Sequence, residues 1–187
     1  MPSRNLTLED IAPEFQDAVG CQEYGAGERI DGVRFVQLRQ FGDEGGYFIE
    51  LARLSENGTI LGVEGDDFKV RQTNFSVLLP GAVKAWHIHY KQEDFWFVPP
   101  SERILVGLKD LRKDSPTCGH TMRFTMGGGK SQLLRIPRGV AHGCANLWTS
   151  NTFMFYFVSQ QFSMDDPDER RLAWDVFGAE FWTIHKG

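Results

Sequence analysis

The stretch that decides the fold is KAWHIHYKQED, residues 84–94. Its polar histidines, His87 and His89, alternate with the apolar Trp86 and Ile88, which is the period of a β-strand whose successive side chains point to opposite faces. The two imidazoles therefore share one face of the predicted strand. Imidazoles on the inner face of a barrel are costly unless they bind a metal, transfer protons or join a polar network.

Alternation of this kind continues on both sides of the stretch, in short segments bounded by Gly, Pro, Asn or Asp. The chain is therefore predicted to be all-β, a sandwich or barrel. Short helices are expected at the two ends, from Thr7 to Gly20 and from Asp166 to Gly178. The predicted strands are 33–40, 47–53, 68–79, 83–90, 94–98, 103–108, 120–126, 132–136 and 152–159.

Length and composition predict a single domain over residues 1–187, with an extension over about 1–32, a barrel over about 33–160 and a helix and tail over about 165–187. The formal net charge of −5 and the absence of a basic run argue against nucleic acid as a partner. Three cysteines are too few for a disulfide framework, and no leader or long apolar run is present. We expect a cytoplasmic protein without a membrane partner.

A second stretch, IPRGVAHGCANL at residues 136–147, provides a third histidine, His142, just after a Pro-x-Gly turn. Together the two stretches resemble the paired motifs of the cupin superfamily, which implies a jelly-roll barrel. In the cupins that bind metal, the equivalent residues hold one Fe, Mn, Ni or Zn ion, so this resemblance implies a possible metal site. Its ligands would be His87, His89, Glu93 and His142.

A closer resemblance covers roughly residues 33–178. The segments FGDEGGYFIE, QTNFSVLLPGAVKAWH, LKDLRKDSPTCG, SQLLRIPRGVAHG and RRLAWD follow one another as in the dTDP-4-dehydrorhamnose 3,5-epimerase family. This resemblance implies a jelly-roll homodimer that needs no cofactor. It also implies that a histidine removes a proton beside the ketone of a nucleotide sugar, and that a tyrosine returns one to the opposite face.

Carried over residue by residue, the resemblance makes His87 the base and places His142 at a second histidine facing the site. Lys84 stands where the family usually has an arginine, and Asp94 where it has a lysine. We expect His89 and Asp94 to contact substrate as well. The positions that match the nucleotide-binding residues are Phe41, Phe48, Glu50, Gln72 and Asn74, although the two phenylalanines could equally be core residues.

Two catalytic landmarks of the family, the tyrosine and the carboxylate that orients the base, are not found directly. Counting thirteen residues on from His142, which is the family spacing, reaches Phe155, and the neighbouring Tyr156 is predicted to face the other side unless a bulge re-aims it. The carboxylate that orients the base is missing at the C-terminus, so Glu93, Asp94 or Asp175 could replace it. The acidic run at 165–169 is interpreted as a solvated helix start. Cys144 could be a nucleophile, but an inert buried thiol is more common.

These observations predict an isomerase of nucleotide-sugar metabolism, a 3,5-epimerase or a relative of one, acting on a dTDP-4-keto-6-deoxyhexose. Three alternatives remain open at this point. The first is a metal-dependent oxygenase or isomerase with one divalent transition metal, and the second is a 3,4-ketoisomerase, which shares the His-x-His pair. The third is an inactive protein that only binds a nucleotide sugar.

Overall fold

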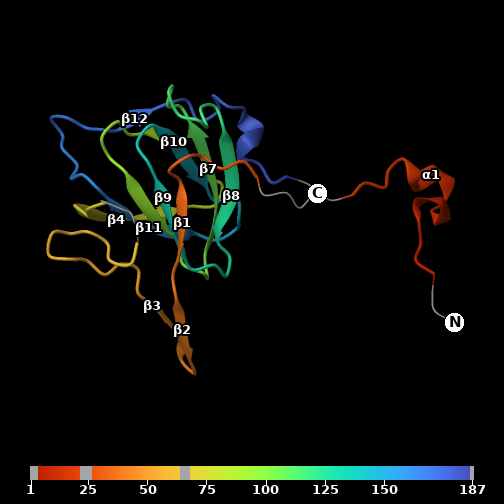
Figure 1. Cartoon of the computed structure of the whole chain (residues 1–187), viewed down its shortest axis with the longest axis horizontal. Coiled ribbons are helices and arrows are strands. Elements are labelled where there is room, and N and C mark those ends of the chain that lie inside the picture. The colour runs from red at the N-terminus through yellow and green to blue at the C-terminus, as the bar shows by residue number, and fades with distance from the viewer. Residues whose placement is uncertain (1–3, 22–26, 64–67, 186–187) are drawn as a thin grey trace.

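The strands of the computed structural model, which describes residues 4–21, 27–63 and 68–185, form two facing five-stranded antiparallel sheets (Figure 1). The strands of the first sheet are, in spatial order, β1 (Arg34–Gln37), β9 (Gln132–Ile136), β6 (Asp94–Phe97), β11 (Thr152–Val158) and β4 (Gln72–Leu78). Those of the second are β12 (Arg170–Arg171), β5 (Val83–Ile88), β10 (Val140–Ala145), β7 (Arg103–Asp110) and β8 (Thr121–Gly127).

This arrangement confirms the predicted all-β jelly roll. A separate hairpin of β2 (Gln40–Asp43) and β3 (Gly46–Ile49) projects beyond the two sheets (Figure 1). Within the described residues, no helix is long and apolar enough to cross a membrane.

The main core lies between the sheets and follows from strand alternation. Trp96 and Leu134 of the first sheet pack against Val106 and Leu108 of the second. The opposite faces of β6 and β9 carry Phe95, Phe97 and Leu133 into a second apolar cluster outside the sandwich. Since burial of apolar surface is the main favourable term in folding, this pattern fixes which strand residues face inward.

The C-terminal segment covers the outer face of the second sheet. Trp86 of β5 packs there against Phe177, Phe181 and Trp182. The indole nitrogens of Trp86 and Trp182 both donate to the carbonyl oxygen of Trp174, at 3.1 and 3.0 Å. This packing holds the chain that precedes it, including β12, against the edge of β5.

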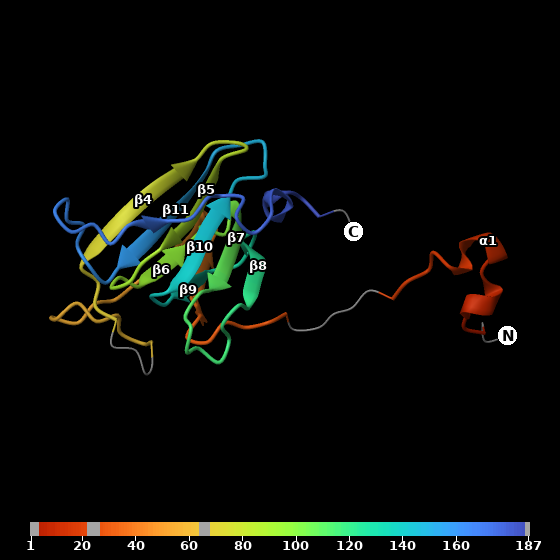
Figure 2. The same ribbon diagram turned by 90° about the horizontal axis from the view of Figure 1, so that it is seen from above.

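The N-terminal helical prediction is confirmed in part. A 3₁₀ turn at Leu8–Asp10, capped by Thr7, is followed by the short helix α1 (Pro13–Gln16). Both lie well away from the barrel (Figures 1 and 2). The helix therefore occupies only part of the predicted span from Thr7 to Gly20.

The predicted helix from Asp166 to Gly178 is wrong. That segment contains β12, in which Arg170 pairs with Ile88 and Arg171 with His87. Just before it, the Asp168 carboxylate accepts hydrogen bonds from the backbone N–H groups of residues 90, 91 and 92 at 2.7–2.9 Å. These tertiary bonds outweigh a weak local helix preference. Between residue 160 and the last described residue, 185, the helical turn is a 3₁₀ turn at Ala179–Trp182.

Candidate functional site

A cavity of about 580 Å³ lies between the two sheets, and the three predicted histidines line it. His87 comes from β5, His89 follows that strand, and His142 comes from the adjacent β10, where its backbone pairs with that of His87. The ring centroids of His87 and His142 are 6.1 Å apart, and those of His89 and His142 are 5.1 Å apart. The predicted convergence of the three imidazoles is therefore confirmed.

His87 has a carboxylate partner that sequence reasoning missed. Its Nδ1 lies 3.2 Å from Oε2 of Glu169, one residue before β12. Burial lowers the pKa of His87, and the hydrogen bond to Glu169 offsets part of that effect. A half-buried, neutral imidazole whose second nitrogen is held by a carboxylate has the geometry of a general base with its orienting group.

Glu169 belongs to the acidic run that was interpreted as a solvated helix start. The available signal was the alternation of Glu169 and Arg171, which places both side chains on one face of a strand. Pairing of β12 with β5 turns that face toward the cavity. Neither Glu93 nor Asp175, two of the predicted substitutes, lines this cavity.

Tyr156 lines the cavity, and the prediction that it faces the other side is wrong. Tyr156 is paired with Trp96 and Phe155 with Phe97, in a register that runs without interruption along β11. Tyr156 therefore shares the inner face with Trp96, whereas Phe155 packs in the outer apolar cluster. Burial raises the pKa of Tyr156, and the nearby Asp94 adds to the rise, so the hydroxyl keeps its proton.

Two cations also line the cavity. Lys84 of β5 donates from Nζ to Oγ of Ser76 at 2.7 Å and to the carbonyl oxygen of Val77 at 3.1 Å. Arg171 of β12 reaches the same cavity. Lys84 therefore lines the same cavity as the predicted base His87, and Arg171 is a second cationic group that the sequence analysis did not identify.

Glu93 does not join the histidines, and its predicted place among the metal ligands is wrong. Its Oε2 is 2.6 Å from Nη2 of Arg135, and its Oε1 is 3.6 Å from Nε of Arg138. The next residue in the chain, Asp94, points the other way and lines the cavity with the histidines. Strand alternation explains the difference, because neighbouring residues face opposite sides.

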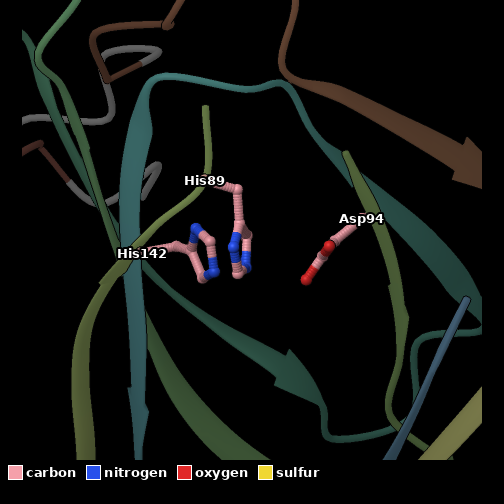
Figure 3. A group of neighbouring side chains, drawn as sticks. All are labelled: His89, Asp94 and His142. Atoms are coloured by element: carbon pink, nitrogen blue, oxygen red, sulfur yellow. The ribbon is translucent and has the colours of Figure 1, made fainter. Parts of the chain in front are cut away.

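Asp94 is fully enclosed beside His89. Its Oδ1 accepts a hydrogen bond from Nε2 of Gln92 at 2.8 Å, and its Oδ2 accepts one from Nε1 of Trp96 at 3.0 Å. Burial raises the pKa of Asp94. Figure 3 shows its carboxylate facing the adjacent rings of His89 and His142. Among the described residues, these three are the group whose geometry suits a metal ion.

Burial also shifts the pKa values of two further residues on the inner wall, His142 and Cys144. Burial lowers the pKa of His142 to about 3, so this imidazole stays neutral. Burial raises the pKa of the Cys144 thiol to about 12, which keeps it in the unreactive thiol form. Of the two alternatives predicted for Cys144, a nucleophile or an inert buried thiol, the structure favours the inert thiol.

The predicted nucleotide-binding residues lie outside this cavity. Phe41 and Phe48 of the β2–β3 hairpin are 46% and 63% exposed, which excludes a core role, and with Glu50 they border a separate hollow of about 370 Å³. On β4, Nε2 of Gln72 donates to Oδ1 of Asn74 at 2.7 Å. Gln72 and Asn74 line a third depression, which shares Tyr156 and Glu169 with the histidine cavity.

Comparison with known proteins identifies the family to which the sequence is similar. Residues 28–180 match the family described as dTDP-4-dehydrorhamnose 3,5-epimerase. The chain is 41% identical over 146 residues to the spore coat polysaccharide biosynthesis protein SpsL of Bacillus subtilis, covering 78% of this chain and 91% of that protein. It is 30% identical over 148 residues to the probable low-salt glycan biosynthesis epimerase Agl13 of Haloferax volcanii, covering 78% and 89% of the two chains.

A similar fold has been solved for a dTDP sugar isomerase from Desulfovibrio desulfuricans G20. That chain superimposes with a TM-score of 0.66 at 28% sequence identity, covering 83% of this chain and 91% of the other.

Proposed function

Because the chain belongs to the dTDP-4-dehydrorhamnose 3,5-epimerase family, we propose that it is an epimerase acting on a dTDP-4-keto-6-deoxyhexose. The reaction inverts a carbon beside the ketone by removing a proton from one face and returning one to the other. The observation that carries this proposal is the His87–Glu169 pair, which shares one cavity with Tyr156.

His87 is proposed as the base. A proton beside a ketone is weakly acidic, and its removal requires an unprotonated base positioned at the carbon. The lowered pKa of His87 keeps the imidazole neutral, and its Nδ1 is already engaged by Glu169, which leaves Nε2 to take the proton. The Glu169 carboxylate then stabilises the imidazolium that forms.

Tyr156 is proposed as the acid that returns a proton to the opposite face. It comes from β11 of the first sheet, whereas His87 comes from β5 of the second, so the two groups approach the cavity from facing walls. Its raised pKa keeps the phenol protonated and available as a donor. The proposed substrate would lie between the two.

Lys84 and Arg171 are proposed to neutralise negative charge on the substrate. Removal of the proton leaves an enolate oxygen, and the nucleotide contributes a pyrophosphate, so an anionic substrate needs cations at the cavity wall. Lys84 already has two hydrogen-bond acceptors, Ser76 and the carbonyl of Val77, which hold its ammonium group in place. His89, Asp94 and His142 complete the polar wall on the sugar side.

The nucleotide is proposed to be held in part by a second copy of the chain. Phe41 and Phe48 lie on the hairpin that projects beyond the two sheets (Figure 1), and Glu50 directly follows it. None of the three lines the histidine cavity of its own chain. Aromatic side chains exposed on such a hairpin suit stacking on a thymine base. A homodimer that exchanges these hairpins would combine them with Gln72 and Asn74 near the cavity. We propose that it works in the cytoplasm and that the two proton transfers themselves need no cofactor.

The test is solvent exchange. The protein is incubated with a dTDP-4-keto-6-deoxyhexose in D2O, and NMR follows deuterium incorporation at C3 and C5 of the sugar. We expect incorporation by the wild-type protein and none by His87→Ala, whereas His120→Ala, which alters a histidine outside the cavity, should match the wild type. Exchange that survives in His87→Ala would show that another group is the base.

The same spectra distinguish the remaining alternatives. Movement of the carbonyl from C4 to C3 would indicate a 3,4-ketoisomerase, which also needs a proton-transfer histidine. Binding of dTDP without any deuterium incorporation would indicate an inactive nucleotide-sugar binder. Each outcome differs from the inversion at C3 or C5 that the proposal requires.

A further inference from the structure

One group of side chains in the cavity wall is not needed for the proposed proton transfers. Ligand atoms of His89, Asp94 and His142 all lie within 4.8 Å of one another, and all three residues are buried (Figure 3). Two imidazoles and one carboxylate form a donor set that divalent transition metals favour. His87 is not a member of this group, because its ring is directed to Glu169.

The two histidines are oriented by backbone carbonyl groups. Nδ1 of His142 lies 3.0 Å from the carbonyl oxygen of Val140, and Nδ1 of His89 bonds the carbonyl oxygen of Asp168. A carbonyl oxygen only accepts, so each Nδ1 must carry the proton. In the neutral ring, Nε2 then carries the lone pair that can bind a metal ion. Metal-binding histidines are usually fixed in this manner by a partner on the second nitrogen.

The Asp94 carboxylate is also held by a hydrogen bond on one oxygen, because its Oδ2 accepts from Nε1 of Trp96. Its Oδ1 lies 2.8 Å from Nε2 of Gln92, which is in turn 3.3 Å from Nε2 of His89. Neighbouring ligands of one ion, with bonds of about 2.1 Å, are about 3.0–3.4 Å apart. The Gln92 amide thus lies at about the distance from His89 and Asp94 that a fourth ligand of the same ion would have. Rotating the amide by 180° would point its oxygen, rather than its nitrogen, at the ion.

We infer that His89, His142 and Asp94, together with the amide oxygen of Gln92, bind one divalent transition metal ion such as Zn²⁺, Fe²⁺ or Mn²⁺. The three residues that line the cavity approach the ion from its wall, so its open coordination positions face the cavity, where a sugar oxygen could bind. The inference does not rest on the proposed base or acid, because it uses neither His87 nor Tyr156.

The experiment uses untagged protein that has been stripped with a chelator and titrated with Co²⁺, whose visible absorption reports binding to protein ligands. We expect one Co²⁺ per chain, checked by elemental analysis, and displacement by Zn²⁺. Asp94→Asn and His89→Ala should abolish saturable binding. Trp96→Phe removes the indole N–H that bonds Asp94 and part of the buried ring beside His142, and should weaken binding about 10- to 100-fold.

The matched controls are His87→Ala and Glu93→Gln, which alter a histidine and a carboxylate adjacent in sequence but outside the group. Both should bind Co²⁺ as the wild type does. Absence of saturable binding by the wild-type protein would overturn the inference, as would wild-type affinity in Asp94→Asn or loss of binding in the two controls. Circular dichroism checks the fold of each variant, and if Asp94→Asn does not fold, unchanged affinity in Trp96→Phe overturns the inference instead.

The two proposals can fail separately. Deuterium exchange without metal binding would remove the metal site and leave the epimerase proposal intact. Metal binding without deuterium exchange would remove the epimerase proposal and leave the metal site intact.

Discussion

Replacing Glu169 by glutamine tests the pairing that only the folded structure revealed. Glutamine has nearly the same shape and can still accept a hydrogen bond from Nδ1 of His87, now 3.2 Å from the carboxylate. What the substitution removes is the negative charge that stabilises the imidazolium after proton abstraction. The variant therefore separates the electrostatic role of Glu169 from its role in positioning the ring.

The size of the effect follows from the burial of the pair. A hydrogen bond to a charged group contributes about 1.5–3 kcal/mol. The Glu169 side chain is 40% exposed and that of His87 is 23% exposed, so solvent screening favours the lower end of this range. A loss of about 1.5 kcal/mol in the transition state corresponds to roughly a tenfold lower rate.

The assay is the initial rate of deuterium incorporation measured over a range of substrate concentrations. We expect kcat to fall about tenfold in Glu169→Gln with little change in KM, because the imidazolium exists only after the proton is taken. Glu169→Asp, which keeps the charge, should recover part of the loss. Asp166→Asn, which changes an exposed carboxylate bonded to Lys91, is the control. A Glu169→Gln rate within twofold of the wild type, or a change confined to KM, would refute the reasoning.

Three further predictions concern the acid, an ion pair and the core. Tyr156→Phe should retain deuterium exchange by His87 but form the inverted sugar about 10²- to 10⁴-fold more slowly by NMR, and unchanged inversion would exclude Tyr156 as the acid. Burial would raise the pKa of Asp110, but hydrogen bonds, led by that of Arg112, lower it below its usual value. Asp110 therefore stabilises the fold above about pH 4 and loses this contribution on further acidification, so Asp110→Asn should cost about 3 kcal/mol in urea unfolding at pH 7 and less at pH 3. In Gly107→Ala, the new Cβ would lie 2.7 Å from Cη2 of Trp86 and closer still to Phe181, so thermal unfolding should show a loss of about 1–3 kcal/mol, in contrast to Gly20→Ala, which meets nothing within 4 Å.

The Asp110 network also explains the stretch DLRKDSPTCG at residues 110–119, which contributed to the resemblance to the epimerase family. The Asp110 carboxylate accepts hydrogen bonds from Arg112, Ser115 and Thr117 at 2.6–2.8 Å. This network organises the loop between β7 and β8. The motif is therefore structural, and its value for recognising the family does not depend on a part in catalysis.

Two errors at the site have the same origin, which is that a residue count does not fix strand register. Counting from His142 led to Phe155, but the connection between β10 and β11 lies outside the strands and can absorb a residue. Register is set instead by pairing with β6, which places Tyr156 beside Trp96 on the inner face. In the same way, the cupin spacing selected Glu93, whereas the pleat directs Asp94 inward.

The sequence by itself determined the all-β class, the family and the inward direction of His87, His89 and His142, because these depend on local alternation and on motifs with fixed spacing. Only the tertiary structure decided which carboxylate orients His87, because Glu169 lies 82 residues away from it along the chain and reaches it through the pairing of β12 with β5. It also decided that Asp94 rather than Glu93 joins the histidines. Contacts between distant segments depend on packing and backbone hydrogen bonds of the whole barrel, and a local pattern does not contain that information.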